Sequence, residues 1–367
     1  MIRERGPLTV AAFMDLALYD PGFGYYARSA QRSGRAGDFF TSVDVGSLFA
    51  ELLEVQLAEM SRILNSEFGI QNSDVVEAGA GNGRLSADIL RTARQRHPDF
   101  YDSIRLHLVE ASEEARKAQR PALGDVVERL ASSGPTLPAS FEGVLIANEL
   151  LDALPVHQVV MREDGLREVY VTTNDERLTT REDLPSTPAL EDYLARLGVS
   201  LEPGWRVEIN LRAVEWIRDA ARRLRRGFMI LIDYGHEARE LYSPTHSAGT
   251  LTSFHKHRSS GPEETAFDRP QWLQHPGEQD LTAHVDFTSV RAAAEAEGMT
   301  TLGFLDQTYL LMGLLDGLPD PESAIRNPQF KTLMLPGGIG STHKVLLLGK
   351  GVGTPPLRGC SFRVRVT

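Results

Sequence analysis

The apolar residues of this chain recur in two spacings that alternate along the sequence. Short stretches rich in apolar residues, typical of core strands, occupy residues 74–78, 104–110, 143–147 and 228–233. Apolar residues at three- and four-residue spacing, typical of amphipathic helices, fill residues 84–95, 113–119 and 211–225. Strands that alternate with helices in this way predict an α/β fold with a doubly wound, mostly parallel sheet.

Other patterns divide the chain around this core. Helical spacing near its start predicts an N-terminal helical and lid segment at residues 1–70. The core then comprises residues 71–156 and 205–350, and a tail follows at 351–367. Two insertions interrupt the core: residues 157–204 carry a strand pair and a helix, and residues 236–283 form a long loop rich in Ser, His, Pro and Gly. Loops of that length are usually functional, so both insertions are expected to face the substrate.

Composition and charge narrow the range of partners. Of the 367 residues, 41% are hydrophobic and 24% are charged, as in ordinary globular proteins. The net charge of −11 argues against a nucleic-acid partner, and no stretch approaches the ~20 apolar residues of a membrane span. The single cysteine, Cys360, excludes an internal disulfide and a cysteine zinc site. We therefore expect a cytoplasmic protein that binds neither nucleic acid nor membrane. The oligomeric state stays open.

A glycine-rich turn follows the first core strand. Glu77 lies near the end of that strand, and Gly79, Ala80, Gly81 and Gly83 lead into the next helix. Glycines allow a nucleotide to approach the backbone closely, although a turn needed only for strand–helix packing would use them too. Nicotinamide-binding turns usually have the longer Gly-x-Gly-x-x-Gly spacing, which seats a pyrophosphate. A carboxylate beside alternating glycines favours a cationic ligand without phosphates, so S-adenosylmethionine fits better than NAD.

The second core strand ends in an acidic residue, Glu110. A carboxylate at that point can accept hydrogen bonds from both hydroxyls of a bound ribose. Nicotinamide enzymes use the same device, so Glu110 indicates a nucleoside cofactor, and the glycine spacing favours S-adenosylmethionine.

Polar side chains follow the third core strand. Asn148, Glu149 and Asp152 come directly after residues 143–147. The carboxyl ends of parallel strands face the ligand crevice, so these side chains can converge beside the cofactor as catalytic groups. If a helical turn follows the strand, Glu149 and Asp152 share one of its faces. The alternative interpretation is that both are merely acids at a helix start, where the dipole favours them.

Ordered motifs along most of the chain resemble the MidA-type methyltransferases, whose mitochondrial relatives act in the assembly of respiratory complex I. The matching stretches are residues 19–26, 37–42, 75–83, 109–110, 147–155, 232–236 and 280–287. The chain departs from the family pattern at residues 43–45, at Ala80 and Asn82, and at Leu150 and Leu151. These departures leave cofactor binding intact and put the identity of the substrate in doubt.

The resemblance implies a class I methyltransferase fold that uses S-adenosylmethionine and, for the mitochondrial relatives, methylation of an arginine side chain on a protein. It implies that Glu77 and the glycine loop bind the cofactor. It also implies a lid over the cofactor, made by Gly37, Asp38, Phe39, Thr41 and Ser42. His284 and Asp286 belong to a matched motif and are expected to support catalysis, although alternation on a strand at a packed corner would explain them as well.

The sequence favours no metal site. His246, His255, His257 and His275 crowd one loop, but their spacing matches no zinc signature. Our hypothesis is methyl transfer to a nitrogen nucleophile, an arginine of a protein partner. Two alternatives remain open: a non-catalytic assembly factor of the same fold that binds a partner protein, and a nicotinamide-dependent oxidoreductase.

Overall fold

The computed structural model describes residue 2 and residues 6–27, 41–174, 177–255, 258–263, 265–266, 269–334 and 342–362. Its centre is an eight-stranded sheet in the order β17-β18-β10-β5-β2-β3-β4, with β16 paired to β10. The strands are β2 (Ser73–Ala78), β3 (Ile104–Val109), β4 (Leu130–Gly134), β5 (Phe141–Asn148), β10 (Leu224–His236), β16 (Val285–Asp286), β17 (Thr300–Asp306) and β18 (His343–Lys350). Strands β4, β3, β2, β5 and β10 are parallel, whereas β18 is antiparallel to both of its neighbours. This arrangement confirms the predicted fold class.

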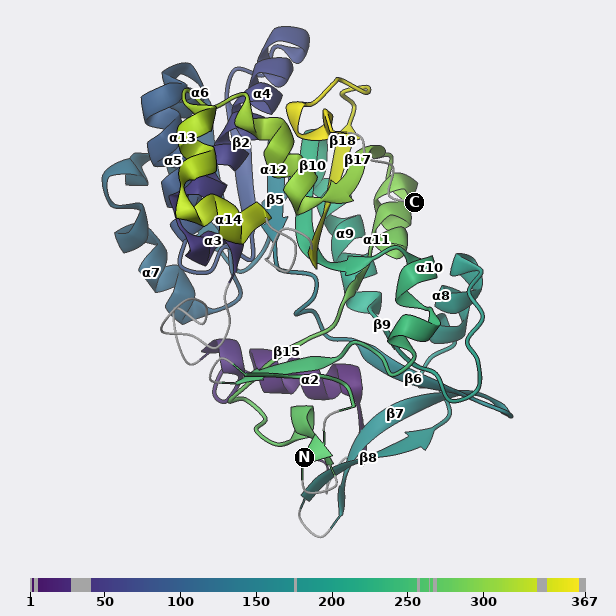
Figure 1. Ribbon diagram of the computed structural model, residues 1–367. Coiled ribbons are helices and arrows are strands. Elements are labelled where there is room, and N and C mark those ends of the chain that lie inside the picture. The colour runs from purple at the N-terminus through teal and green to yellow at the C-terminus, as the bar shows by residue number, and fades with distance from the viewer. Residues whose placement is uncertain are drawn as a thin grey trace.

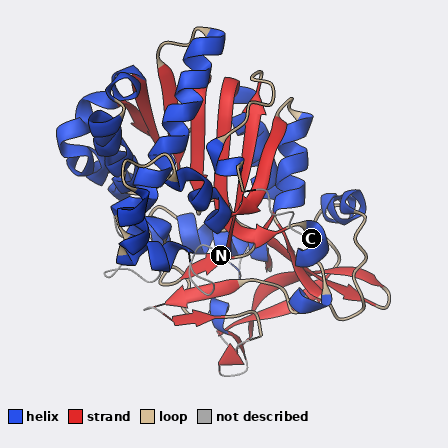
Figure 2. Cartoon of the chain, turned by 45° about the horizontal axis from the view of Figure 1, so that its top comes forward, coloured by secondary structure: helices blue, strands red, loops and turns tan. Residues whose placement is uncertain are grey.

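Helices cover both faces of this sheet, as Figure 2 shows. The longer helices are α4 (Ser47–Phe68), α5 (Arg84–Arg96), α7 (Glu113–Leu123), α9 (Leu211–Arg223), α11 (Phe287–Ala296) and α12 (Gln307–Leu315). Alternate residues of each strand enter different cores, because successive side chains of a strand point to opposite faces. Val144 and Ile146 of β5 pack with α4 and α5, whereas Leu145 and Ala147 pack with α9 and α11. The doubly wound architecture therefore follows from the continuous apolar runs.

A second, antiparallel sheet forms a lower layer (Figure 1). It contains β1 (Leu8–Thr9), β6 (His157–Arg162), β7 (Gly165–Asn174), β8 (Arg177–Asp183) and β9 (Arg206–Ile209). Helix α2 (Val10–Tyr19) packs on this sheet, where Phe13 meets the ring of Trp272 at a centroid distance of 5.7 Å. The first predicted helix thus belongs with the 157–204 insertion, and β9 pairs with β6 outside the main sheet.

The 236–283 segment has more regular structure than its sequence pattern indicated. It holds α10 (Ala238–Leu241), β11 (Thr252–His255), β12 (Arg258–Ser260) and β15 (Asp280–Thr282), and these strands form a small antiparallel sheet. The pair β13 (Thr265–Ala266) and β14 (Arg269–Pro270) lies in the same segment. Figure 1 shows β15 beside α2, between the main sheet and the lower layer.

Short elements complete the described part of the chain. They are η1 (Tyr25–Ala27), α3 (Ser42–Val45), α6 (Pro98–Ser103), η2 (Gly124–Arg129), α8 (Ala189–Leu197), η3 (Pro244–His246), η4 (Gln271–Leu273), α13 (Pro321–Arg326), α14 (Pro328–Met334) and η5 (Arg358–Cys360). None of the helices described is both long enough and apolar enough to cross a bilayer.

Candidate active site

The glycine loop joins β2 to α5 in a conformation that requires its glycines. Gly79, Gly81 and Gly83 have φ angles of 72°, 50° and 80°, in the left-handed region where other residues are strained. The backbone N–H groups of Gly79 and Ala80 donate to the carbonyl of Val109 at 2.9 and 3.1 Å, which ties the loop to the end of β3. A Cβ atom at Gly81 would meet nothing within 4 Å, so this part of the loop borders open space. The loop can therefore hold a ligand against its backbone.

Glu110 stands directly beside this open part of the loop. Its Oε2 accepts the N–H of Gly81 at 2.9 Å, and its Oε1 accepts the N–H of Ser112 at 2.8 Å. A carboxylate offers about four acceptor sites, so two remain for the hydroxyls of a ribose. The placement is the one expected for a residue that binds a nucleoside at the end of β3.

Glu77 is buried in β2 and faces α5 rather than open space. Ser86 of α5 donates its hydroxyl proton to the Glu77 carboxylate. Burial raises the pKa of Glu77 to about 7. The contact with Ser86 indicates that Glu77 holds α5 against β2, behind the loop, and does so partly protonated at neutral pH.

The segment after β5 does not form the helical turn considered from the sequence. Residues 149–156 contain bends, turns and irregular backbone and no helix. Glu149 has a φ of 51°, and no other non-glycine residue in the described ranges has a positive φ. This left-handed residue reverses the chain, and a helix cannot begin there. The alternative of acids at a helix start is therefore wrong as well, because no helix starts at this point.

Asp233, at the end of β10, organises this turn. Its Oδ2 accepts the N–H groups of Leu150, Leu151 and Asp152 at 3.1, 2.7 and 3.4 Å. It is 1% exposed, and burial raises its pKa to about 7. Asp233 lies in the matched stretch 232–236 but was not among the predicted site residues. Its position at the carboxyl end of a core strand was the available signal.

Glu149 lies at the centre of a polar group drawn from separate elements. Its Oε1 accepts the N–H of Ser42 at 3.3 Å and the Nδ2 of Asn148 at 3.2 Å, and it lies 3.5 Å from Nε2 of His343. The Oδ1 of Asn148 is buried and has no hydrogen-bond partner within the described ranges. The arrangement leaves an unused acceptor beside a carboxylate.

Several carboxylates meet at this point. The pKa of Asp152 is raised well above its ordinary value by burial, then by the charges of Asp233, Glu149 and Asp280. Carboxylates crowded in this way retain protons unless a cation joins them. The site therefore suits a positively charged ligand.

The N-terminal motif closes one side of the site. Tyr19 donates its hydroxyl proton to the carbonyl of Ala153 at 3.0 Å, and Tyr26 donates to Oδ1 of Asp280 at 2.8 Å. Both pKa values are raised well above the ordinary tyrosine value, chiefly by burial and next by Asp280. A cavity of about 320 Å³ lies between these rings and the residues that follow Glu110. Neither tyrosine was among the predicted site residues, although both lie in a matched motif.

The expected lid falls partly outside the described residues, because Gly37, Asp38 and Phe39 are not among them. Thr41 and Ser42 are described and begin α3. Thr41 donates its N–H and its hydroxyl proton to Asp44, and Asp44 in turn lies 3.6 Å from Arg84 at the start of α5. Ser42 also bonds Glu149. This end of the lid therefore connects the start of α5, next to the glycine loop, with the acidic group formed by Glu149, Asp152, Asp233 and Asp280.

Comparison with known proteins identifies the family. Residues 52–305 match the family described as "Putative S-adenosyl-L-methionine-dependent methyltransferase", which is more than half of the chain. The chain belongs to the MidA-type methyltransferases. This methyltransferase thus has S-adenosylmethionine as its cofactor, and the nicotinamide alternative is wrong.

Relatives and solved structures agree with this assignment. "Protein arginine methyltransferase NDUFAF7, mitochondrial" of Rattus norvegicus is 31% identical over 88% of the methyltransferase and 76% of that relative. The homolog of the same name in Drosophila melanogaster is 28% identical over 96% and 83%. A COG1565 superfamily member from Burkholderia thailandensis, bound to S-adenosyl-homocysteine, superimposes with a TM-score of 0.84 at 27% identity, over 100% of this chain and 93% of that one.

These comparisons correct the expected location. The curated relatives are named as mitochondrial proteins, so the cytoplasmic location expected of this methyltransferase is wrong. The expectation rested on the absence of a disulfide framework, which argues against an oxidising compartment and does not distinguish among the others.

Two expected catalytic residues of the methyltransferase have other surroundings. Asp286 caps α11: its carboxylate accepts the N–H of Thr288 at 2.9 Å and the hydroxyls of Ser289 and Tyr193 at 2.6 and 2.8 Å. His284 packs against His236 and His246 rather than against Glu149. The structure thus favours the structural interpretation of Asp286 that the sequence left open.

Proposed function

We propose that this methyltransferase methylates an arginine side chain of a protein partner. The observation that carries the proposal is a group of hydrogen-bond acceptors that lie close together and outnumber the donors around them. It comprises the unused Oδ1 of Asn148 and the carboxylates of Glu149 and Asp152. A guanidinium has five N–H donors, no acceptor and a permanent positive charge, so it complements this set.

The cofactor end of the site supports the same proposal. We assign Glu110 to the ribose and the loop of Gly79, Ala80, Gly81 and Gly83 to the rest of the cofactor. Bound S-adenosylmethionine supplies the methyl group: the new N–C bond forms as the S–C bond breaks, and sulfur keeps the electron pair. The names of the relatives, which are protein arginine methyltransferases, agree with this choice of acceptor.

The chain's own groups then act by position and charge. Glu149 and Asn148 hold the guanidinium plane, and the carboxylate localises positive charge away from the attacking nitrogen. After transfer, the methylated nitrogen must lose a proton, and Glu149 is the acceptor within reach. The lid residues Thr41 and Ser42 exclude water from this exchange.

The test is transfer of labelled methyl groups from S-adenosylmethionine into proteins of a lysate from a strain that lacks this protein. We expect label in one or a few proteins, released as methylarginine on hydrolysis. Calorimetry with S-adenosylhomocysteine runs in parallel. Cofactor binding without transfer to any protein would favour the alternative of a non-catalytic assembly factor, and label on another residue type would overturn the choice of acceptor.

A further inference from the structure

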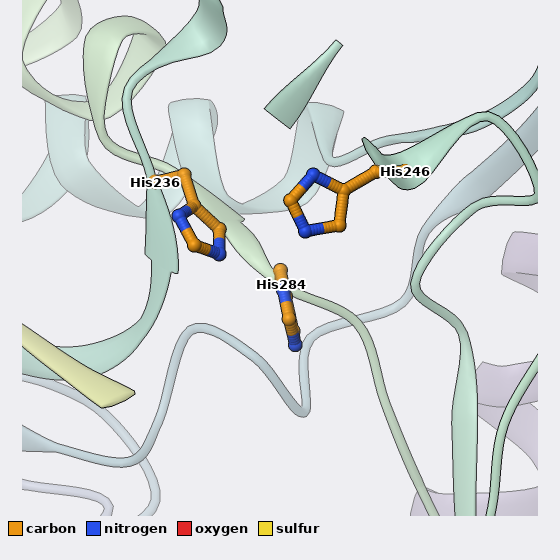
Figure 3. Close-up of side chains that lie close together, drawn as sticks. All are labelled: His236, His246 and His284. Atoms are coloured by element: carbon orange, nitrogen blue, oxygen red, sulfur yellow. The ribbon is translucent and has the colours of Figure 1, made fainter. Parts of the chain in front are cut away.

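Three histidines from distant parts of the sequence meet at the end of β10 (Figure 3). His236 is the last residue of β10, His246 ends η3, and His284 directly precedes β16. One ring nitrogen of each lies within 4.8 Å of the other two. Figure 3 shows the rings of His236 and His246 turned toward the space beside His284.

We propose that His236, His246 and His284 form a binding site for a divalent transition metal ion with the ligand preferences of zinc. A point equidistant from three atoms 4.8 Å apart lies about 2.8 Å from each. Zinc–imidazole bonds measure ~2.0–2.1 Å, so each ring needs to move inward by less than about 1 Å. Rotation about the side-chain torsions is enough for that movement.

The hydrogen bonds around the rings support ligation. Nδ1 of His246 donates to the carbonyl of Glu240 at 3.0 Å, so in the neutral ring Nε2 is the nitrogen whose lone pair can bind a metal. Such a bond from the second ring nitrogen is typical of metal-bound histidines. Nδ1 of His284 is buried and has no hydrogen-bond partner among the residues described. A buried imidazole nitrogen without a partner carries a cost that a metal bond would remove.

Packing of the rings against one another explains the three histidines less well than metal binding does. The three rings are tilted by 45°, 39° and 71° to one another and are not stacked. Oε1 of Glu240 lies 3.0 Å from Nδ1 of His236, without the alignment of a hydrogen bond, and water or this carboxylate can take the fourth position.

The site would fasten the 236–284 segment to the sheet. This segment carries Asp280, and the N–H of Ala283 donates to the carbonyl of Asp152 at 3.0 Å. A metal at His284 would therefore fix one wall of the acidic group. Nothing in the sequence indicated this site, because its members are 10 and 38 residues apart and only His246 belongs to the histidine-rich loop whose spacing matched no zinc signature.

The test uses the full chain without a histidine tag, stripped with a chelator and titrated with zinc by calorimetry in the absence of cofactor. Cobalt, followed by its visible absorption, reports the geometry. We expect one equivalent to bind. His246→Ala should weaken binding by more than the ~10- to 100-fold typical of changes outside the ligand set. His275→Ala is the matched control, since that ring stacks on His255 away from the group.

Half-buried His246 lies on a short helix, so its loss should leave the fold intact, and circular dichroism checks this. His236→Gln is the second variant if His246→Ala fails to fold. Absence of zinc binding by the wild type, or equal binding by the variant and the wild type, would overturn the proposal. Both outcomes are measured as zinc binding and not as methyl transfer, so this proposal and the proposed function can fail separately.

Discussion

Glu149 combines a strained backbone with a positioned carboxylate. A left-handed φ of 51° costs a non-glycine residue on the order of 1–3 kcal/mol and persists only where neighbouring contacts fix it. Here the N–H of Glu149 donates to the carbonyl of Ile232 at 2.8 Å, and Asp233 binds the next three N–H groups. Strained residues of this kind are common at functional sites. Here the left-handed conformation directs the Glu149 carboxylate toward Ser42 and Asn148.

Replacing Glu149 by Gln removes the negative charge of the side chain and keeps its size and shape. The amide oxygen still accepts from Ser42 and Asn148, so the fold and cofactor affinity should persist, whereas methyl transfer should fall by ~100-fold, the scale of losing a preorganised charge. Labelled transfer and calorimetry measure the two effects, with exposed Glu191→Gln as control. An equal loss of cofactor affinity would make Glu149 a cofactor ligand, and full activity would leave it a turn residue.

Glu110→Ala should weaken S-adenosylhomocysteine binding by at least tenfold. The variant removes up to two charge-assisted hydrogen bonds to the ribose, each worth roughly 1.5–3 kcal/mol. Calorimetry measures the affinity, and Glu202→Ala, at an exposed position away from the cavity, serves as the control. Unchanged affinity in a folded Glu110→Ala protein would contradict the assignment of the ribose to this residue.

Glu77 should make stability depend on pH. Its pKa is raised from 4.5 to about 7, so the folded state binds the proton more tightly than the unfolded state. Below pH ~4.5 Glu77 is protonated in both the folded and the unfolded state, so its burial does not lower the free energy of unfolding. Stability then falls as pH rises to about 7, by roughly 3 kcal/mol in total.

Glu77→Gln keeps the acceptor for Ser86 and cannot ionise. Its unfolding free energy, measured in urea from pH 5 to pH 8, should therefore fall less with rising pH than that of the wild type. Parallel curves for the two proteins would show that Glu77 does not titrate in this range.

At the scale of elements, α3 should respond to the cofactor. Its first residue, Ser42, bonds Glu149 and also donates to Gln307 of α12 at 3.1 Å, while Asp44 reaches Arg84. Bound cofactor would lie beneath this bridge and reduce its opening. Hydrogen exchange across residues 41–45 should slow on addition of S-adenosylhomocysteine, whereas exposed α13 should not change. Identical exchange with and without ligand would remove the lid proposal.

Sequence patterns located most of the longer strands, including the pair β6 and β7 with mixed burial, and missed two short ones. Continuous apolar runs marked β2, β3, β5 and β10 to within a few residues, except that β10 continues to His236. Strand β4 lies at the edge of the sheet and contains three exposed residues, Ala131, Ser132 and Ser133. It therefore has no apolar run from which a strand could be predicted. Strand β9 is four residues long, and its pairing with β6 depends on contacts that a local pattern does not record.

The same limit applies to the site. Glu149 and Asp152 follow an apolar run directly, which made them visible. Asp233 acts on a turn more than 80 residues away, and the three histidines come from residues 236–284, so only the folded chain brings them together. The sequence could not decide whether a helical turn follows β5, because nothing in the residue types indicated the left-handed conformation of Glu149.

At the scale of the whole molecule, the lower layer should be an integral part of the fold. Met14 of α2 is fully buried in the core shared with the second sheet and Trp272. Met14→Ala should lower the free energy of unfolding by about 2–5 kcal/mol through lost packing. Phe23→Ala is the control, since Phe23 is 74% exposed and surface changes stay within ~0.5 kcal/mol. Urea denaturation compares the two, and equal stability would mean that α2 does not unfold with the core.

The position of β18 has a consequence for biosynthesis. Strand β18 follows every other strand that the structure describes, yet it lies inside the sheet, between β10 and the edge strand β17. A nascent chain on the ribosome therefore holds β10 with an unpaired edge until residues 343–350 emerge, and such edges invite pairing with other chains. His343, beside Glu149, arrives with the same strand. The chain thus completes its sheet and its acidic site in one late step of translation, and a prematurely terminated product lacks both.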